Sequence, residues 1–253
     1  MTRRWSIAGG LVLVLFAGAM SPSLAQTRVT ADWLKSLKTS ANDPTGDAFT
    51  GSRAELTRTL DAILADPSMV SPMYLFFASK TAFNLSRLED AAFLFYASQL
   101  RAAFDFSRFE INGTPDGNNA ATYLGFLRKT IGQSVNPAIM LKPVNFANAI
   151  DRLDRWTLVP SPQAFYPEFA DAKGFKTPAE KWPSMAATLK GRFMVEFGRR
   201  QSRLLKDGPY FEAFQFVQAM NQGLIENTPA NQARFQKENE AMAAAEKRLF
   251  PTK

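Results

Sequence analysis

Carboxylates are the side chains left for acid–base chemistry, because the 253 residues include no histidine and no cysteine. Histidine bases, histidine-bound zinc and cysteine nucleophiles are therefore excluded. Two suitably separated carboxyl groups can still hydrolyse a glycosidic bond. Candidates lie in two irregular stretches and are Asp105, Glu110, Asp116, Glu168 and Asp171. Their spacing selects no pair, so the sequence assigns no catalytic residue.

Calcium is the metal whose oxygen ligands remain available. Asp43, Thr45 and Asp47 have the alternate spacing with which an EF-hand loop begins. Alanine stands at two later positions that such a loop requires, at Ala48 for the turn glycine and at Ala54 for the bidentate acid. We therefore expect neither a metal nor a cofactor.

A run of basic residues follows one face of a helix predicted over 178–206. Its members recur at helical spacing and are Arg192, Arg199, Arg203 and Lys206. Glu196 lies among them and can pair with neighbouring arginines, which favours a solvated surface. The same stripe could instead receive an anionic partner, so we keep it as a candidate binding surface.

Phenylalanine occurs 22 times in the chain. Packing in the core accounts for most of these rings. A surplus would line a groove for an acyl chain or an amphipathic peptide. The candidates for such a groove lie in a helix predicted over 87–104 and are Phe93, Phe95 and Tyr96.

Apolar residues recur at helical spacing through nearly the whole chain, which predicts an all-α fold. The expected helices cover residues 30–38, 53–65, 72–84, 87–104, 119–131, 144–156, 178–206, 209–224 and 229–249. We expect these helices, about nine in number, to form one domain, arranged as helical hairpins or a repeat-like bundle. Two stretches between them, 105–118 and 157–176, are long for simple connections.

Several helix starts carry a hydroxyl residue that can cap free backbone N–H groups. Three of them have a glutamate three residues later, as in a capping box, and lie at Ser52, Ser86 and Thr177. Two others, Ser71 and Thr228, are followed directly by proline, which suits a first helical turn. Each of these signals predicts that a helix begins there.

Helix ends are marked as well. Asp66-Pro67 and Asp207-Gly208-Pro209 stand where apolar stripes end. Gly132 predicts a helix end in the same way. Pro183 is expected to break or restart the helix over 178–206.

The segment from Tyr74 to Phe104 contains two adjoining predicted helices with small residues among their contact positions. These positions are Leu75, Ala78 and Ala82 on the first helix and Ala91, Phe95 and Ser98 on the second. The spacing resembles the helical hairpin of tetratricopeptide and Sel1-like repeats, in which small residues let two helices approach closely. That resemblance implies a protein-binding or peptide-binding role without catalysis. A plain antiparallel helix pair has the same spacing.

The first 25 residues have the organisation of a bacterial export signal. Arg3 and Arg4 precede an apolar stretch from Ile7 to Met20, and Ser23-Leu24-Ala25 offers small residues for cleavage. We expect cleavage after Ala25 and a mature domain of residues 26–253 in the periplasm or outside the cell. No later stretch has the length of a membrane-spanning helix, so we expect no transmembrane anchor.

The formal net charge is +7 at pH 7, and Arg3 and Arg4 contribute two of these charges. A moderately basic exported protein suits contact with anionic envelope components, although the charge equally serves solubility. Nucleic acid is not an expected partner outside the cell. Without histidine, the charge should change little between about pH 5 and 8 unless a carboxylate is strongly perturbed.

Three functions remain open. The leading hypothesis is a soluble, non-catalytic binding protein of the cell envelope, which holds a protein or peptide against an aromatic groove with a basic rim. The alternative is a carboxylate-dependent hydrolase that acts on envelope polysaccharide. An inhibitor or immunity protein directed against an exported toxin would share the sequence features of the first. The sequence specifies neither the partner nor the oligomeric state.

Overall fold

The computed structural model describes residues 29–37, 49–110, 120–160 and 174–251. Within these ranges the chain is helical, apart from connecting turns and an isolated antiparallel bridge between Phe109 and Phe175. The all-α prediction is therefore confirmed for the described part of the chain. The predicted export signal lies outside these residues.

The α-helices are α1 (Ala31–Ser36), α2 (Arg53–Ala65), α3 (Pro72–Asn84), α4 (Leu88–Arg108), α5 (Ala120–Met140), α6 (Pro143–Arg155), α7 (Trp182–Phe193), α8 (Arg200–Leu205), α9 (Gly208–Asn221) and α10 (Pro229–Leu249). Two 3-10 turns, η1 (Pro67–Met69) and η4 (Ala179–Lys181), precede α3 and α7, and a π-helical turn, η5 (Met194–Arg199), joins α7 to α8.

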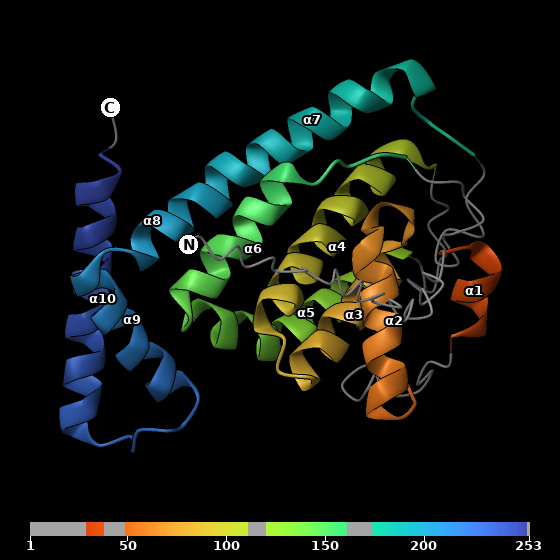
Figure 1. Ribbon diagram of the computed structural model, residues 1–253. Coiled ribbons are helices and arrows are strands. Elements are labelled where there is room, and N and C mark those ends of the chain that lie inside the picture. Colours follow the sequence, from red (N-terminus) through yellow and green to blue (C-terminus); the bar gives the residue numbers. More distant parts are fainter. Residues whose placement is uncertain (1–28, 38–48, 111–119, 161–173, 252–253) are drawn as a thin grey trace, which may run out of the picture.

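Helix α4 runs through the centre of the molecule. It packs against α3, α5, α6 and α7 (Figure 1). Most of its side chains from Ala91 to Asp105 are buried. A helix that is apolar around most of its circumference is stable only when neighbours cover it on all sides. This central position explains the concentration of aromatic residues in α4.

Helices α3 and α4 form the hairpin predicted over 74–104. Ala78, Ala82 and Ala91 have no exposed surface, and the hydroxyl of Ser79 donates to the carbonyl of Ala91 (2.8 Å). The two helices thus approach closely where small residues were expected. A relationship to tetratricopeptide or Sel1-like repeats stays a prediction.

Helices α9 and α10 lie side by side at the end of the molecule opposite α1, and α8 leads to them (Figure 1). Helix α10 contacts its neighbours through a narrow stripe, in which Ala245 is buried and Met242 and Leu249 are partly buried. Most of its other side chains are exposed. Ion pairs from Glu246 to Arg200 (2.7 Å) and from Arg248 to Asp207 (2.6 Å) supplement this narrow stripe in attaching α10 to its neighbours.

Three helices have the bounds that the sequence predicts, α2, α3 and α10. The capping box of α2 is formed, because the N–H of Glu55 donates to Ser52 Oγ (3.3 Å) and the N–H of Ser52 donates to Glu55 Oε2 (2.7 Å). Ser71 caps α3 and Thr228 caps α10 through their side-chain oxygens. Hydroxyl caps therefore fix the starts of these helices.

The predicted helix cap at Ser86 is wrong. Ser86 has a φ of 64° and follows the end of α3. Its N–H donates to the carbonyl of Phe83, and the N–H of Arg87 donates to the carbonyl of Ala82 (2.8 Å). These two bonds form a Schellman motif, which uses a left-handed residue just beyond a helix. Only a short turn separates α3 from α4. Ser86 therefore belongs to the motif that ends α3 and does not cap α4.

The predicted cap at Thr177 is also wrong. Its hydroxyl donates to the carbonyl of Ser107 (2.8 Å) and thereby ties this segment to α4. The 3-10 turn η4 follows, and Pro183 lies in the first turn of α7. Pro183 therefore starts this helix, because its fixed φ and missing N–H are compatible with a first turn.

The sequence predicts that a helix ends at Gly132. In the structure α5 instead continues to Met140 and contains Pro137. Gly132 is buried, and a Cβ atom there would lie 2.9 Å from Cζ of Phe95 on α4. Close packing against α4 therefore accounts for this glycine, and no turn occurs there. Helix α4 likewise extends beyond its predicted end at residue 104, to Arg108.

Candidate functional site

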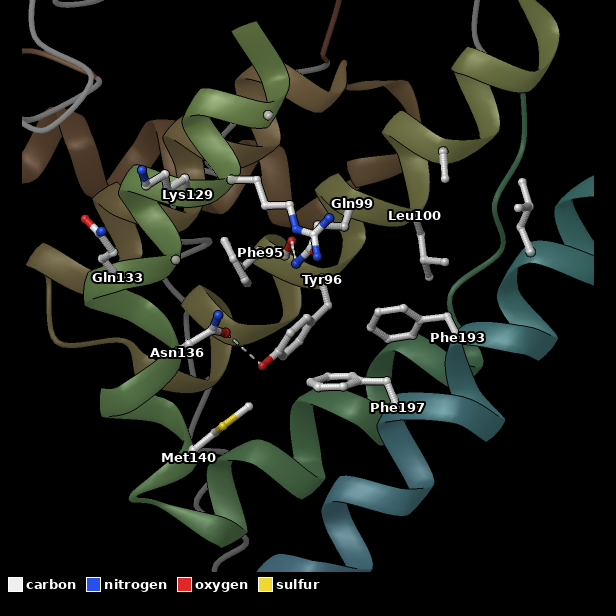
Figure 2. A pocket seen from close by; sticks show the side chains of 15 residues that line it. Phe95, Tyr96, Gln99, Leu100, Lys129, Gln133, Asn136, Met140, Phe193 and Phe197 are labelled. Carbon is white, nitrogen blue, oxygen red and sulfur yellow. Dashed lines mark hydrogen bonds between the residues drawn. The ribbon is translucent and has the colours of Figure 1, made fainter. Parts of the chain in front are cut away.

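A cavity of about 900 Å³ lies between α4, α5 and the segment formed by α7 and η5. In Figure 2, α5 forms one wall, α7 with η5 forms the other, and the aromatic side chain of Tyr96 extends between them. The lining residues are Phe95, Tyr96, Gln99, Leu100 and Ala103 from α4, Gly125, Arg128, Lys129, Gly132, Gln133, Asn136 and Met140 from α5, and Leu189, Phe193 and Phe197 from α7 and η5.

Tyr96 is the centre of the aromatic floor of this cavity. Its ring centroid lies 5.4 Å from that of Phe95, 5.8 Å from that of Phe193 and 5.3 Å from that of Phe197. Its hydroxyl donates to Oδ1 of Asn136 (3.1 Å) and so links α4 to α5. Burial raises the pKa of Tyr96, which keeps the hydroxyl protonated as a hydrogen-bond donor.

Two glycines shape the wall that α5 provides. The missing side chain at Gly132 leaves room for the ring of Phe95, which would otherwise meet a Cβ atom at 2.9 Å. At Gly125 a Cβ atom would meet no atom within 4 Å. Because Gly125 also lines the cavity, its missing side chain leaves this part of the cavity open.

The opposite wall is held against α6. The ammonium group of Lys190 donates to the carbonyls of Asp154 and Trp156 at the end of α6, the latter at 2.8 Å. Gly198 in η5 allows a close approach to α6, because a Cβ atom there would lie 3.1 Å from Cγ2 of Ile150. Wide helical turns such as η5 occur frequently at functional sites.

The rim of the cavity is basic and polar. Arg128, Lys129 and Gln133 are exposed on α5, and Gln99 and Asn136 are partly buried. No Asp or Glu is among the described residues that line the cavity. The cavity therefore combines an aromatic floor with two positive charges at its edge, and this combination favours a ligand with an apolar body and a negative charge.

The structure separates the three aromatic residues singled out in the sequence. Phe95 and Tyr96 line the cavity. Phe93 lies elsewhere in the core, where its ring centroid is 6.2 Å from that of Trp156 and the guanidinium of Arg152 is 4.2 Å from its centroid. Phe93 and Phe95 are two residues apart and point to nearly opposite sides of α4. Phe93 and Tyr96 are three residues apart and share a side, so the packing of Phe93 against Arg152 and Trp156 keeps it out of the cavity.

The basic stripe predicted on one helix face does not line the cavity. Arg199 pairs with Asp154 (3.5 Å), although both side chains are about half exposed. The guanidinium of Arg203 lies 5.4 Å from the ring centroid of Phe250, and Arg192 and Lys206 are exposed. The turn η5 also interrupts the stripe, because a π-helical turn contains more residues than an α-helical one.

The sequence did not single out the basic rim on α5. A predicted helix end near residue 131 excluded Gln133, Asn136 and Met140 from any helix face. One available signal was the recurrence of polar residues and glycines at helical spacing from Gly125 to Asn136. This pattern becomes visible only when the helix is continued through Gly132.

The carboxylates of the hydrolase hypothesis do not meet in the described part of the chain. Asp105 is fully buried and pairs with Arg108 (2.7 Å), and Glu110 is exposed. Asp116, Glu168, Asp171 and the EF-hand-like run at 43–48 lie outside the described residues. Within the described ranges, no three acidic side chains gather closely enough to hold a metal ion.

Asp105 is nevertheless a perturbed carboxylate. Burial raises its pKa from an ordinary value of 3.8 to about 6, against the opposing effects of the positive charges of Arg101 and Arg108. The guanidinium of Arg108 lies within 5 Å of the ring centroids of three aromatic residues, Phe104, Phe109 and Trp182. An acid enclosed in this way has a structural role, because it balances a buried guanidinium.

None of the helices in the described ranges is both long and apolar enough to cross a membrane. Comparisons of the chain with known protein families, with curated proteins and with solved structures found no match.

Proposed function

We propose that this chain is an exported, non-catalytic binding protein whose ligand enters the cavity between α4, α5 and α7. The cavity itself carries the proposal. Its volume of about 900 Å³ lies within the range of roughly 300–1,000 Å³ typical of ligand pockets. An aromatic floor with a few polar groups at its edge is the usual composition of such pockets.

The arrangement of the floor supports binding of an apolar group. Phe193 and Phe197 stand on one wall, and Tyr96 rises from α4 between the walls (Figure 2). Tyr96 is held in place by its hydrogen bond to Asn136. A pocket whose rings are fixed before the ligand arrives loses less conformational entropy on binding.

The sequence of residues 1–25 is the reason for proposing that the protein is exported. A positive start, an apolar stretch and a small-residue cleavage site support secretion across the bacterial inner membrane. The ligand would then be met in the periplasm or outside the cell. Fractionation of cells that express the full chain tests this part, and recovery of uncleaved protein in the cytosol would contradict it.

A substitution that fills the cavity tests the binding site. Gly125→Trp places a large ring at a cavity-lining position where a Cβ atom has open space. Gly191→Trp is the matched control, because Gly191 is exposed, lies within α7, has open space at its Cβ and does not line the cavity. Both substitutions replace a helical glycine, so both variants should fold.

The uncharged dye Nile red serves as the probe, because its fluorescence rises in apolar surroundings. We expect the wild-type protein and Gly191→Trp to bind it alike and Gly125→Trp to bind it about tenfold more weakly. Circular dichroism and urea unfolding establish that both variants are folded. Equal binding by the two variants, or no binding by the wild-type protein, would overturn the proposal.

A further inference from the structure

We infer that the ligand of this cavity is a fatty carboxylate, with its head group at Arg128 and Lys129 and its hydrocarbon chain along α5 towards Met140. The inference rests on the proposed function, since it requires that the cavity bind an apolar ligand at all. It adds the chemical class of that ligand and its direction in the site.

The charged residues that line the cavity lie towards one end of its α5 wall, and Met140 lies at the other end. Along α5 the lining residues change from Arg128 and Lys129, through Gln133 and Asn136, to Met140. At 1.5 Å per residue, Arg128 and Met140 lie about 18 Å apart along the helix axis. In Figure 2, Lys129 lies at one end of the site, with Met140 and Phe197 at the other. An elongated ligand with one polar end fits this gradient.

The head-group end selects a negative charge. Arg128 and Lys129 are adjacent and exposed, and the described lining contains no acid that would neutralise them. A guanidinium offers a carboxylate two parallel N–H donors, and the ammonium group of Lys129 adds a second positive charge on the same wall. Because both side chains contact water, their attraction to the head group is modest and is reduced by salt.

The other end selects a hydrocarbon chain over a peptide. The cavity walls are helices, in which most N–H and C=O groups of interior residues are bonded within the helix. The carbonyl of Gln133 is an exception, because Pro137 has no N–H to donate to it. An extended peptide placed between these helices would leave most of its own backbone groups without partners, which is costly in an apolar site. A hydrocarbon chain has no such groups and can pack directly on Tyr96, Phe193 and Phe197.

Displacement of Nile red from the purified protein measures the head-group preference. The competitors share one chain length and differ in the head group: dodecanoate, dodecanol, dodecyltrimethylammonium and dodecyl phosphate, each used below its micelle concentration. We expect dodecanoate to displace the dye at concentrations about tenfold lower than dodecanol requires, with the ammonium compound weakest. Dodecanol or the ammonium compound displacing the dye as well as dodecanoate would overturn the inference, and stronger displacement by dodecyl phosphate would overturn its carboxylate assignment.

Two double variants assign the preference to the rim. In the double variant Arg128→Gln with Lys129→Gln, dodecanoate and dodecanol should displace Nile red at equal concentrations, each corrected for the affinity of this variant for the dye. Arg192→Gln with Arg203→Gln removes the same charge from exposed positions outside the lining and should keep the preference. If the first double variant keeps the preference, the inference is wrong although the proposed binding site stands. If Nile red does not bind the wild-type protein, the proposed function itself fails.

Discussion

The ring of Phe95 on α4 lies so close to Gly132 on α5 that a Cβ atom at position 132 would be 2.9 Å from Cζ of the ring. This contact sets the distance between the two helices and forms part of the cavity floor. The backbone of α5 and the ring of Phe95 are both held by surrounding helices, so neither can move away without cost.

Gly132→Ala should therefore destabilise the protein, although alanine is the better helix former. We expect the free energy of unfolding to fall by about 1–3 kcal/mol, because the added methyl group overpacks the contact. Gly191→Ala, at an exposed position of α7 with open space, should instead raise it by up to about 1 kcal/mol. Urea denaturation measures both values. Similar stabilities for the two variants would contradict this prediction, because they would show that the ring of Phe95 can move away from the added methyl group at little cost.

Ser86→Gly should stabilise the protein. Ser86 adopts a φ of 64° in the Schellman motif that ends α3, a conformation that costs a non-glycine residue roughly 1 kcal/mol. We expect the free energy of unfolding to rise by about that amount, in thermal or urea unfolding. Ser86→Ala should change it little, whereas Ser71→Ala, which removes a true helix cap, should lower it by about 1 kcal/mol. A loss of stability in Ser86→Gly would contradict the motif.

Asp105 should make the stability depend on pH despite the lack of histidine. Burial raises its pKa to about 6 in the folded chain, above the ordinary 3.8 expected when unfolded, so the folded state binds this proton more tightly. The resulting stabilisation is complete below about pH 4 and is lost as the pH rises through about 6, by up to about 3 kcal/mol. Urea unfolding at a series of pH values measures the change.

Asp105→Asn provides the control for this pH dependence. The variant cannot titrate at this position, so its free energy of unfolding should lack the decrease between about pH 4 and 6. Below about pH 4 the carboxyl group of the wild-type protein is already neutral, so the two proteins should have similar stabilities there. An equal decrease in both proteins would assign the titration to another carboxylate.

Asp90 should contribute more to stability than Asp61, although both pair with Arg87. Asp90 accepts from Arg87 and from Arg152, each at 2.7 Å, and its side chain is 18% exposed, whereas that of Asp61 is 56% exposed. Asp90→Asn should lower the free energy of unfolding by about 1 kcal/mol, and Asp61→Asn by less than about 0.5 kcal/mol. Denaturation in low and high salt measures both effects, and a larger loss in Asp61→Asn would reverse this order.

Local signals in the sequence were sufficient to predict the starts of α2, α3 and α10. Ser52 and Glu55 make the same two hydrogen bonds whatever lies around them, so the start of α2 could be predicted. The same pattern failed at Ser86, because the short turn between α3 and α4 gives this residue a different task. A capping pattern shows that a residue is able to cap a helix. Whether it does so depends on how the neighbouring helix is placed.

The sequence singled out some aromatic residues of the cavity but not its basic rim. Phe95 and Tyr96 line the cavity, whereas the neighbouring Phe93 packs in the core. All three side chains are buried, and only the packing of α4 against its neighbouring helices decides which of them reach the cavity. The basic rim at Arg128 and Lys129 was missed although both residues lie inside the predicted helix over 119–131, because nothing near them in the sequence shows that this face of the helix borders a cavity.

The amino-acid sequence by itself determined that this chain is helical, where several of its helices begin, and which catalytic chemistries are excluded by the lack of histidine and cysteine. These properties depend on residues close together in the chain. The tertiary structure alone decided which aromatic residues face a cavity, which basic residues surround it and that Asp105 is enclosed beside Arg108. The cavity joins helices that are distant in sequence. Asp105 and Arg108 are three residues apart on α4, but they are buried because distant residues such as Trp182 cover them.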